Sequence, residues 1–179
     1  NGTVSGLIES GSKIGVCKYI IHSTATKPDQ VVSVNDFIAS VQATDDRFIG
    51  FGTLHPDFED IGEEVDRIIS LGFKGIKLHP DFQRFNIDGE NMIPIYRAIE
   101  GRLPLLMHMG DEEKTFSHPR RLARVLDIFP SLTVIAAHMG GYMRWEESME
   151  FLVGRDLYFD TSSTLAFMDS SEVVEMIRA

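Results

Sequence analysis

The chain has 179 residues, of which 43% are hydrophobic and 25% charged, as in a soluble globular protein with a sizeable core. Its 27 acidic and 17 basic side chains give a formal net charge of −10, which disfavours binding to nucleic acids or to anionic membranes. The single cysteine, Cys17, excludes an internal disulfide and favours a reducing compartment. No apolar run approaches the roughly 20 residues of a membrane span. Residues 1–4 show no signal-peptide pattern, so we expect a cytoplasmic protein with one domain over residues 1–179.

Short apolar runs alternate along the chain with stretches of helical periodicity. In chain order they predict a helix over residues 4–14, a strand over 16–21, a helix over 28–41, a strand over 48–54, a helix over 65–71, a strand over 73–78, a helix over 92–99, a strand over 103–107, a helix over 117–129, a strand over 132–137, a helix over 145–152, a strand over 157–159 and a helix over 173–177. Residues 81–89 are polar and rich in turn formers, and we expect the longest irregular loop there. Ser117 is the expected N-cap of the helix that follows it.

This alternation of strand and helix predicts an α/β fold with a parallel sheet. The strands end near residues 22, 55, 79, 108, 138 and 160, about 28 residues apart on average. A (β/α)₈ TIM barrel of about 250 residues has a period of about 31. The spacing therefore favours a TIM-barrel-like fold, and a doubly wound sheet is the structural alternative.

The count of predicted elements, six strands and seven helices, differs from that of a closed eight-unit barrel. Such a barrel needs one more strand before residue 1 and one more after residue 179. Six strands alone leave two open edges, which soluble proteins avoid. The chain is thus expected to be a partial barrel, with its edges covered by further strands or by another chain. Pairing of identical chains in a homo-oligomer would also cover these open edges.

Five of the six histidines stand at the carboxyl ends of predicted strands, and Asp160 stands at the sixth strand end. These histidines are His22, His55, His79, His108 and His138. In a parallel barrel all such ends meet at one face, where active sites are built. Histidine is the commonest metal ligand and a near-neutral acid or base, so the pattern predicts a site for zinc or a similar divalent ion.

His108 and His138 are the strongest candidates in this set, because a glycine follows each of them closely and lets a ligand approach the backbone. Lys77 precedes His79 by two residues and is expected on the same face of its strand. For His79 and Lys77 a structural role is an equal alternative. We expect His22 and His55 to be structural, and His118 to cap a helix, since it lies away from any strand end.

Three segments make the chain resemble the amidohydrolase superfamily. They are Gly75-Ile76-Lys77-Leu78-His79-Pro80, Leu106-Met107-His108 and Ala137-His138-Met139-Gly140-Gly141. The resemblance is greatest to the amidohydrolase-2 branch of metal-dependent TIM-barrel hydrolases, which also contains aromatic-acid decarboxylases. It implies that His108 binds a metal and that His138 binds a second metal or acts on substrate and water. Some members carry a carboxylated lysine at the position that Lys77 matches.

Two parts of the family pattern have no counterpart in the chain. A first-strand His-x-His pair would lie before residue 1, and an eighth-strand aspartate would lie after residue 179. Asp160 is on the seventh strand of the implied barrel and does not replace that aspartate. Residues 1–179 alone are therefore expected to hold a metal only weakly.

The leading functional hypothesis is a metal-dependent hydrolase that cleaves a C–N or C–O bond of a small molecule. His108 and His138 would bind a divalent ion, with zinc the first choice and manganese the second. His138, His79 and Lys77 would act on the substrate. Non-oxidative decarboxylation by a lyase on the same scaffold is the close alternative. A truncated, non-catalytic barrel fragment that binds a partner chain is a hypothesis of another class.

Overall fold

The computed structural model describes residues 3–179. Within them the strands are β1 (Tyr19–Ile21), β2 (Phe48–Gly52), β3 (Gly75–Leu78), β4 (Leu105–Met107), β5 (Val134–Ala136) and β6 (Tyr158–Phe159). The α-helices are α1 (Val4–Ser12), α2 (Val31–Gln42), α3 (Ile61–Ser70), α4 (Pro80–Gln83), α5 (Ile93–Ile99), α6 (Pro119–Ile128), α7 (Trp145–Phe151) and α8 (Ser170–Arg178). Two short 3₁₀ helices, η1 (Pro28–Gln30) and η2 (Glu90–Met92), and the left-handed turn η3 (His138–Gly140) join them.

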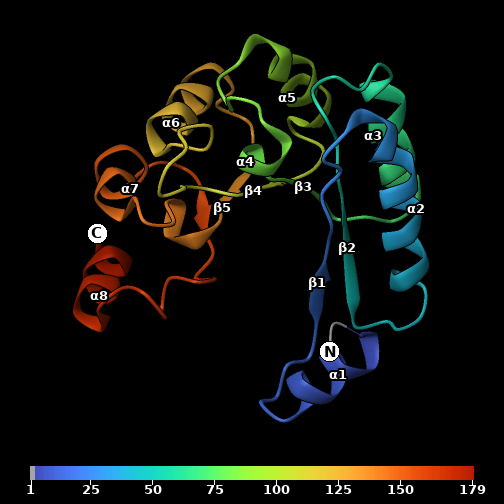
Figure 1. The fold of residues 1–179 in the computed structure, drawn as a ribbon, viewed down its shortest axis with the longest axis horizontal. Helices are drawn as coiled ribbons and strands as arrows, with labels where there is room; N and C mark the ends of the chain where they lie inside the picture. Colours follow the sequence, from blue (N-terminus) through green and yellow to red (C-terminus); the bar gives the residue numbers. More distant parts are fainter. Residues whose placement is uncertain (1–2) are drawn as a thin grey trace.

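The six strands form one parallel sheet in the order of the sequence, from β1 to β6. Helices α2, α3, α5, α6 and α7 follow one another as an arc around the outside of the strands (Figure 1). In the part of the chain described, β6 does not pair with β1, so the sheet is an open arc. The predicted TIM-barrel-like α/β fold is confirmed.

Strand alternation divides the apolar side chains between two cores. The larger core fills the space between the sheet and the helices and includes Ile76, Leu78, Leu105 and Met107. A much smaller cluster, Phe51, Leu106 and Ala137, lies on the opposite, inner face. That face also carries Lys77, since Lys77 alternates with Ile76 and Leu78 and pairs in register with Leu106. The inner face is thus only partly filled with apolar side chains.

The segment after β3 differs from its prediction. Residues 81–89 were expected to be irregular, but α4 covers Pro80–Gln83 and η2 begins at Glu90. Pro80 is at the first position of α4, where its fixed φ suits a helix and its missing N–H leaves nothing unpaired. With α4 the described residues contain eight α-helices rather than seven. The single turn was missed because it is too short for helical periodicity to be visible.

The cap of α6 also differs from its prediction. His118 rather than Ser117 is the N-cap, and its Nδ1 accepts a hydrogen bond of 3.1 Å from the backbone N–H of Arg120. The expected capping role of His118 is therefore confirmed. Ser117 is fully buried and donates its hydroxyl proton elsewhere, to Asp81.

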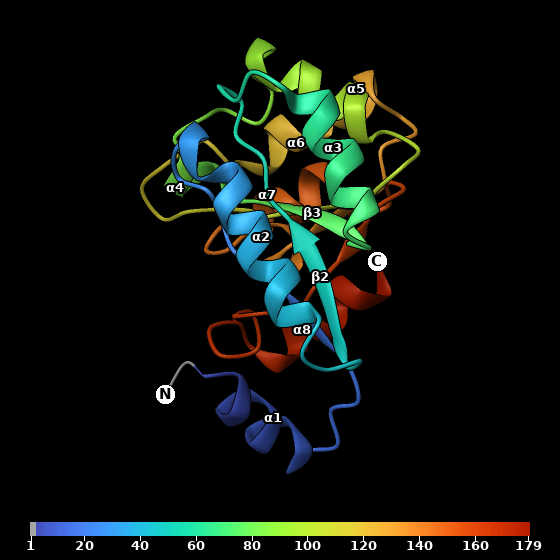
Figure 2. The same cartoon turned by 90° about the vertical axis from the view of Figure 1, so that its right-hand side faces the viewer.

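Helices α2 and α3 lie over β2 (Figure 2), and a buried polar cluster joins the end of the strand to both of them. Asn35 of α2 accepts a hydrogen bond of 2.7 Å from the backbone N–H of Thr53 and donates one of 3.0 Å to its carbonyl. The same amide donates to Glu64 of α3, which is also buried. These bonds fix the end of β2, because Thr53 directly follows the strand.

No helix among residues 3–179 combines the length and the apolar character that crossing a membrane requires.

Replacing Asn35 with alanine is expected to destabilise the fold by about 3 kcal/mol. The change leaves both backbone groups of Thr53 buried without their partner, and each such group costs about 1–3 kcal/mol. Urea unfolding followed by circular dichroism measures the effect. Ser40→Ala, at an exposed hydroxyl of the same helix, is the control and should stay within about 0.5 kcal/mol of the wild type. A loss below about 1 kcal/mol for Asn35→Ala would contradict this role.

Candidate metal and substrate site

The carboxyl ends of the strands surround a cavity of about 550 Å³ on the inner side of the sheet. Four of the predicted side chains, Lys77, His79, His108 and His138, line it together. The predicted site residues therefore converge on one place. His22, which we expected to be structural, also lines this cavity.

His108 and His138 lie in direct contact at the centre of this group. His108 directly follows β4 and His138 begins η3 after β5, and the two strands are hydrogen-bonded neighbours. His138 Nε2 is 3.0 Å from His108 Nδ1, and the two rings meet edge to face. Two nitrogens bound to one tetrahedral zinc ion lie about 3.3 Å apart, given Zn–N bonds of about 2.0–2.1 Å. The spacing suits a shared ion.

A backbone carbonyl behind each ring sets the proton positions. His138 Nδ1 is 2.8 Å from the carbonyl oxygen of Ser162, and His108 Nε2 is 3.0 Å from that of Gly110. A carbonyl oxygen only accepts, so the hydrogen-bond network assigns a proton to each of these outer nitrogens. The facing nitrogens, His108 Nδ1 and His138 Nε2, are then the ones left to bind a ligand. They can share a proton or a metal ion, and the donor set therefore fits a divalent metal.

Burial favours the neutral form of His108. Desolvation, followed by the proximity of His79 and His138, lowers the pKa of His108 far below its ordinary value. A neutral imidazole is the form that binds a metal. The electrostatic environment of His108 thus agrees with the assignment from hydrogen bonds.

The backbone at His138 is held in an unusual conformation. His138, Met139 and Gly140 have φ values of 60°, 53° and 78°, all in the left-handed region. For residues other than glycine such a conformation costs roughly 1–3 kcal/mol and persists only where the surroundings enforce it. Here Asp160 enforces it, because its carboxylate accepts from His138 N at 2.9 Å and its carbonyl accepts from Met139 N at 2.7 Å.

Asp160 also fixes the carbonyl that holds His138. Its Oδ1 accepts hydrogen bonds from both the backbone N–H and the hydroxyl of Ser162. The strand-end aspartate therefore supports the histidine through the backbone.

His79 is positioned by stacking and by a buried glutamine. Its ring lies between those of Phe82 and His108, each with its centroid 3.7 Å away. Gln83 accepts from His79 N at 2.8 Å and donates to the carbonyls of Ala25 and Leu54, so that one amide ties the ends of three strands. Burial, then Lys77, lowers the pKa of His79 to about 4, and the ring is neutral.

Lys77 is 6% exposed, and its ammonium group makes no hydrogen bond or ion pair within residues 3–179. Burial lowers the pKa of Lys77 to about 8, while the charge of Asp160 acts in the opposite direction. The Lys77 side chain is buried and lines the cavity, so its ammonium group is suited to pairing with an anionic group that enters there.

Aromatic side chains form the wall nearest His138. Tyr142 and Phe167 both line the cavity, and their rings meet edge to face with centroids 5.6 Å apart. Phe167 is 60% exposed. A flat or apolar part of a ligand can pack on this wall.

The glycine that follows His108 serves a different purpose from the one predicted. Gly110 has φ = 80°, and a Cβ there would lie 2.4 Å from the backbone of Tyr142. The close approach is therefore between two loops of the protein rather than between the backbone and a ligand.

His55 lies away from the cavity, as expected for a structural residue. Its ring is 5% exposed, and Nδ1 accepts a hydrogen bond of 3.2 Å from the backbone N–H of Asp57 in the next turn.

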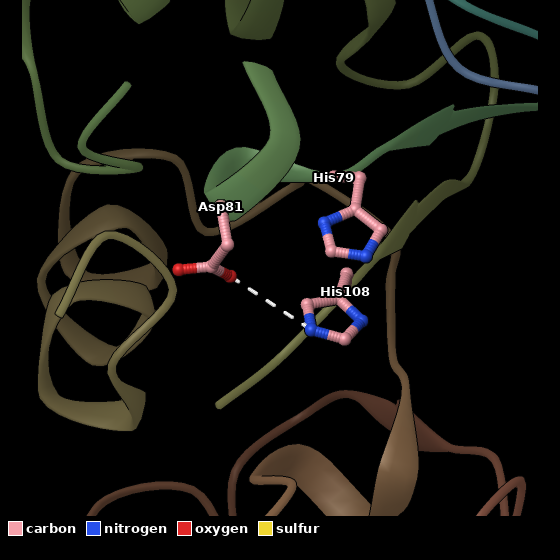
Figure 3. Close-up of side chains that lie close together, drawn as sticks. All are labelled: His79, Asp81 and His108. Carbon is pink, nitrogen blue, oxygen red and sulfur yellow. Dashed lines mark ion pairs between the residues drawn. The ribbon is translucent and has the colours of Figure 1, made fainter. Parts of the chain in front are cut away.

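Asp81 is the main participant that the sequence analysis missed. It belongs to α4, and its carboxylate faces the ring edges of His79 and His108 (Figure 3). Donor atoms of His79, Asp81 and His108 lie within 4.8 Å of one another, which is a possible metal-binding group. Asp81 Oδ1 and His79 Nδ1 are buried without a hydrogen-bond partner in the described part of the chain. Its position two residues after a strand-end histidine was the available signal.

A family model described as amidohydrolase matches residues 22–173. Among solved structures, the TIM-barrel protein Bb4693 from Bordetella bronchiseptica superposes with a TM-score of 0.77 at 19% sequence identity, over 96% of this chain and 64% of that one. A "probable 2-pyrone-4,6-dicarboxylic acid hydrolase" from Acinetobacter baumannii gives a TM-score of 0.67 at 13% identity, over 98% of this chain and 66% of that one. A Staphylococcus aureus protein described as an amidohydrolase gives 0.69 at 15% identity, over 98% and 76%.

At these identities the solved structures establish the fold alone. The chain spans less than two thirds of the length of the first two, 64% and 66%. The family model is more specific, because it spans most of the chain and includes every strand-end histidine and Asp160. The chain belongs to the amidohydrolase family.

Proposed function

We propose that the protein is a metal-dependent hydrolase that cleaves a C–N or C–O bond in a small molecule carrying a carboxylate. The observation that carries the proposal is the pair of imidazole nitrogens, His108 Nδ1 and His138 Nε2, which face each other at 3.0 Å beside the cavity. A histidine pair of this kind suits zinc, with manganese as the alternative.

A divalent ion at this place supplies Lewis acidity, which makes water more acidic and polarises a carbonyl oxygen. The chain's own residues hold the reacting groups. Ser162 and Gly110 keep the protons on the outer nitrogens of His138 and His108, so that the inner nitrogens stay free to bind. The neutral ring of His79 stands beside them as a hydrogen-bonding group for the substrate.

The carboxylate in the proposed substrate is argued from Lys77. This residue lines the same cavity as the histidines, and a carboxylate there would give its ammonium group a charge-assisted hydrogen bond. The aromatic wall of Tyr142 and Phe167 suits a planar substrate body. The similar protein from Acinetobacter baumannii is known as a probable hydrolase of a dicarboxylic acid, which supports the same substrate class.

Zinc binding tests the ligand pair directly. His108→Ala and His138→Ala should each weaken Zn²⁺ affinity by about 100-fold or more, since loss of an outer partner alone costs 10–100-fold. Competition with a chromogenic chelator measures the ratio to the wild type, even where absolute affinity is low. His118→Asn is the control, because asparagine preserves the helix cap and lies outside the cavity. Wild-type affinity in both alanine variants would exclude this metal site.

The reaction type is tested with the zinc-loaded protein on a panel of carboxylated lactones, esters, amides and aromatic acids. Hydrolysis adds the mass of one water to the substrate, and mass spectrometry detects the product. Decarboxylation on the same site is the alternative, since the family resemblance also covers aromatic-acid decarboxylases. Release of CO₂ with no hydrolytic product would therefore replace the hydrolase assignment with a lyase.

Lys77→Met should weaken binding of the carboxylated substrate by about 10- to 100-fold, because a hydrogen bond to a charged group contributes about 1.5–3 kcal/mol. The change should appear mainly in KM and should be absent for an uncharged analogue of the same substrate. Lys74→Met is the matched control, as Lys74 lies just before the same strand and is exposed. Equal losses for the charged and the uncharged substrate would show that Lys77 does not select a carboxylate.

A further inference from the structure

The two ring nitrogens of His108 face opposite sides. Nδ1 points to His138 and the cavity, as described above. Nε2 points away from it, toward the Gly110 carbonyl at 3.0 Å and the Asp81 carboxylate, whose Oδ2 is 3.8 Å away (Figure 3). The Asp81 side chain is completely buried in this position. A buried carboxylate therefore stands behind the histidine that we assign to the metal.

Two separate elements hold Asp81 in place. Its backbone is in the first turn of α4, which Pro80 begins directly after His79. Its Oδ2 accepts a hydrogen bond from Ser117, which is fully buried just before α6. The Ser117 carbonyl in turn accepts from Gly110 N at 3.0 Å, so the same residue connects both partners of His108 Nε2. The arrangement fixes the carboxylate to the side of the ring that faces away from the cavity.

We propose that Asp81, held by Ser117, is a positioning residue for the metal site. The Gly110 carbonyl lies 3.0 Å from His108 Nε2 and the buried Asp81 Oδ2 lies 3.8 Å from it, so a lone pair on Nε2 would face two acceptor oxygens. This geometry favours a proton on Nε2 and leaves Nδ1 as the nitrogen that donates to the metal. Histidines that bind metals commonly donate their second N–H to an outer partner, which sets the tautomer and raises ligand basicity; here the Gly110 carbonyl accepts that proton and Asp81 lies beside it. This inference rests on the proposed function, since it needs His108 to bind the metal.

Direct binding of one ion by His79, Asp81 and His108 is the competing arrangement, and ring geometry disfavours it. The rings of His79 and His108 are stacked with centroids 3.7 Å apart and planes inclined by only 13°. A metal binds in the plane of an imidazole, along the nitrogen lone pair. Two nearly parallel planes at this separation do not direct their lone pairs to one point, and Phe82 packs on the far side of His79.

The test measures Zn²⁺ affinity of Asp81→Asn and Ser117→Ala by chelator competition. Asp81→Asn should lose about 10- to 100-fold, the usual effect of removing an outer partner. Ser117→Ala should lose less, in the same direction, because the carboxylate remains but is no longer held. Asp57→Asn is the matched control: Asp57 lies 3.8 Å from His55 Nδ1, the same separation, but it is exposed and outside the cavity. Thermal unfolding of each variant checks that it folds. If Asp81→Asn fails to fold, the zinc affinity of Ser117→Ala still tests the proposal.

Nitrogen NMR of the metal-free protein gives a second readout that a merely structural role would not change. The wild type should show His108 protonated on Nε2, and Asp81→Asn should shift the ring toward a tautomer mixture. Unchanged affinity and tautomer in Asp81→Asn, together with lost binding in His108→Ala, would overturn the positioning role and leave the proposed function standing. Wild-type binding in His108→Ala would overturn the proposed function itself. A carboxylate ligand seen by X-ray absorption in the wild type and lost in Asp81→Asn would make Asp81 a direct ligand and overturn the inference.

Discussion

The arrangement of the site depends on two backbone carbonyls, which bind the ring nitrogens of His108 and His138 that point away from each other. The Gly110 and Ser162 oxygens can only accept hydrogen bonds, and they therefore leave the inner nitrogens of both rings as lone pairs 3.0 Å apart. The backbone that carries the His138 ring to this position is left-handed at His138 and Met139. The bonds from Asp160 offset the backbone strain where it arises.

The parallel sheet supplies the rest of the geometry. Because β3, β4 and β5 are neighbours in register, the residues that follow them emerge side by side at one end of the inner face. The same alternation that buries Ile76 and Leu78 against the helices turns Lys77 inward. An inner face with a small apolar cluster leaves room for a cavity, whereas a fully packed interior would have closed the site.

Strand order and the convergence of His79, His108 and His138 could be predicted from sequence, because both follow from periodicity and from the geometry of parallel strands. Asp81 stands two residues after a strand-end histidine, but its contact with His108 could not be predicted from that position. It depends on how α4 and the segment before α6 approach each other, and neither Asp81 nor Ser117 carries a periodic signal. His55-Pro56 and His79-Pro80 look alike in sequence, yet His55 bonds to its own turn while the ring of His79 is stacked between Phe82 and His108.

The stacking of Phe82, His79 and His108 also shows why proximity alone does not identify the metal ligands. Donor atoms of His79, Asp81 and His108 lie as close together as those of a metal site. The ring planes of His79 and His108, however, are nearly parallel, whereas those of His108 and His138 are inclined by 75°. Lone pairs that lie in planes inclined by 75° can meet at one ion, and those in parallel planes cannot. The direction of the lone pairs therefore favours the proposed metal position between His108 and His138, and with it the proposed role of Asp81 on the other side of the His108 ring.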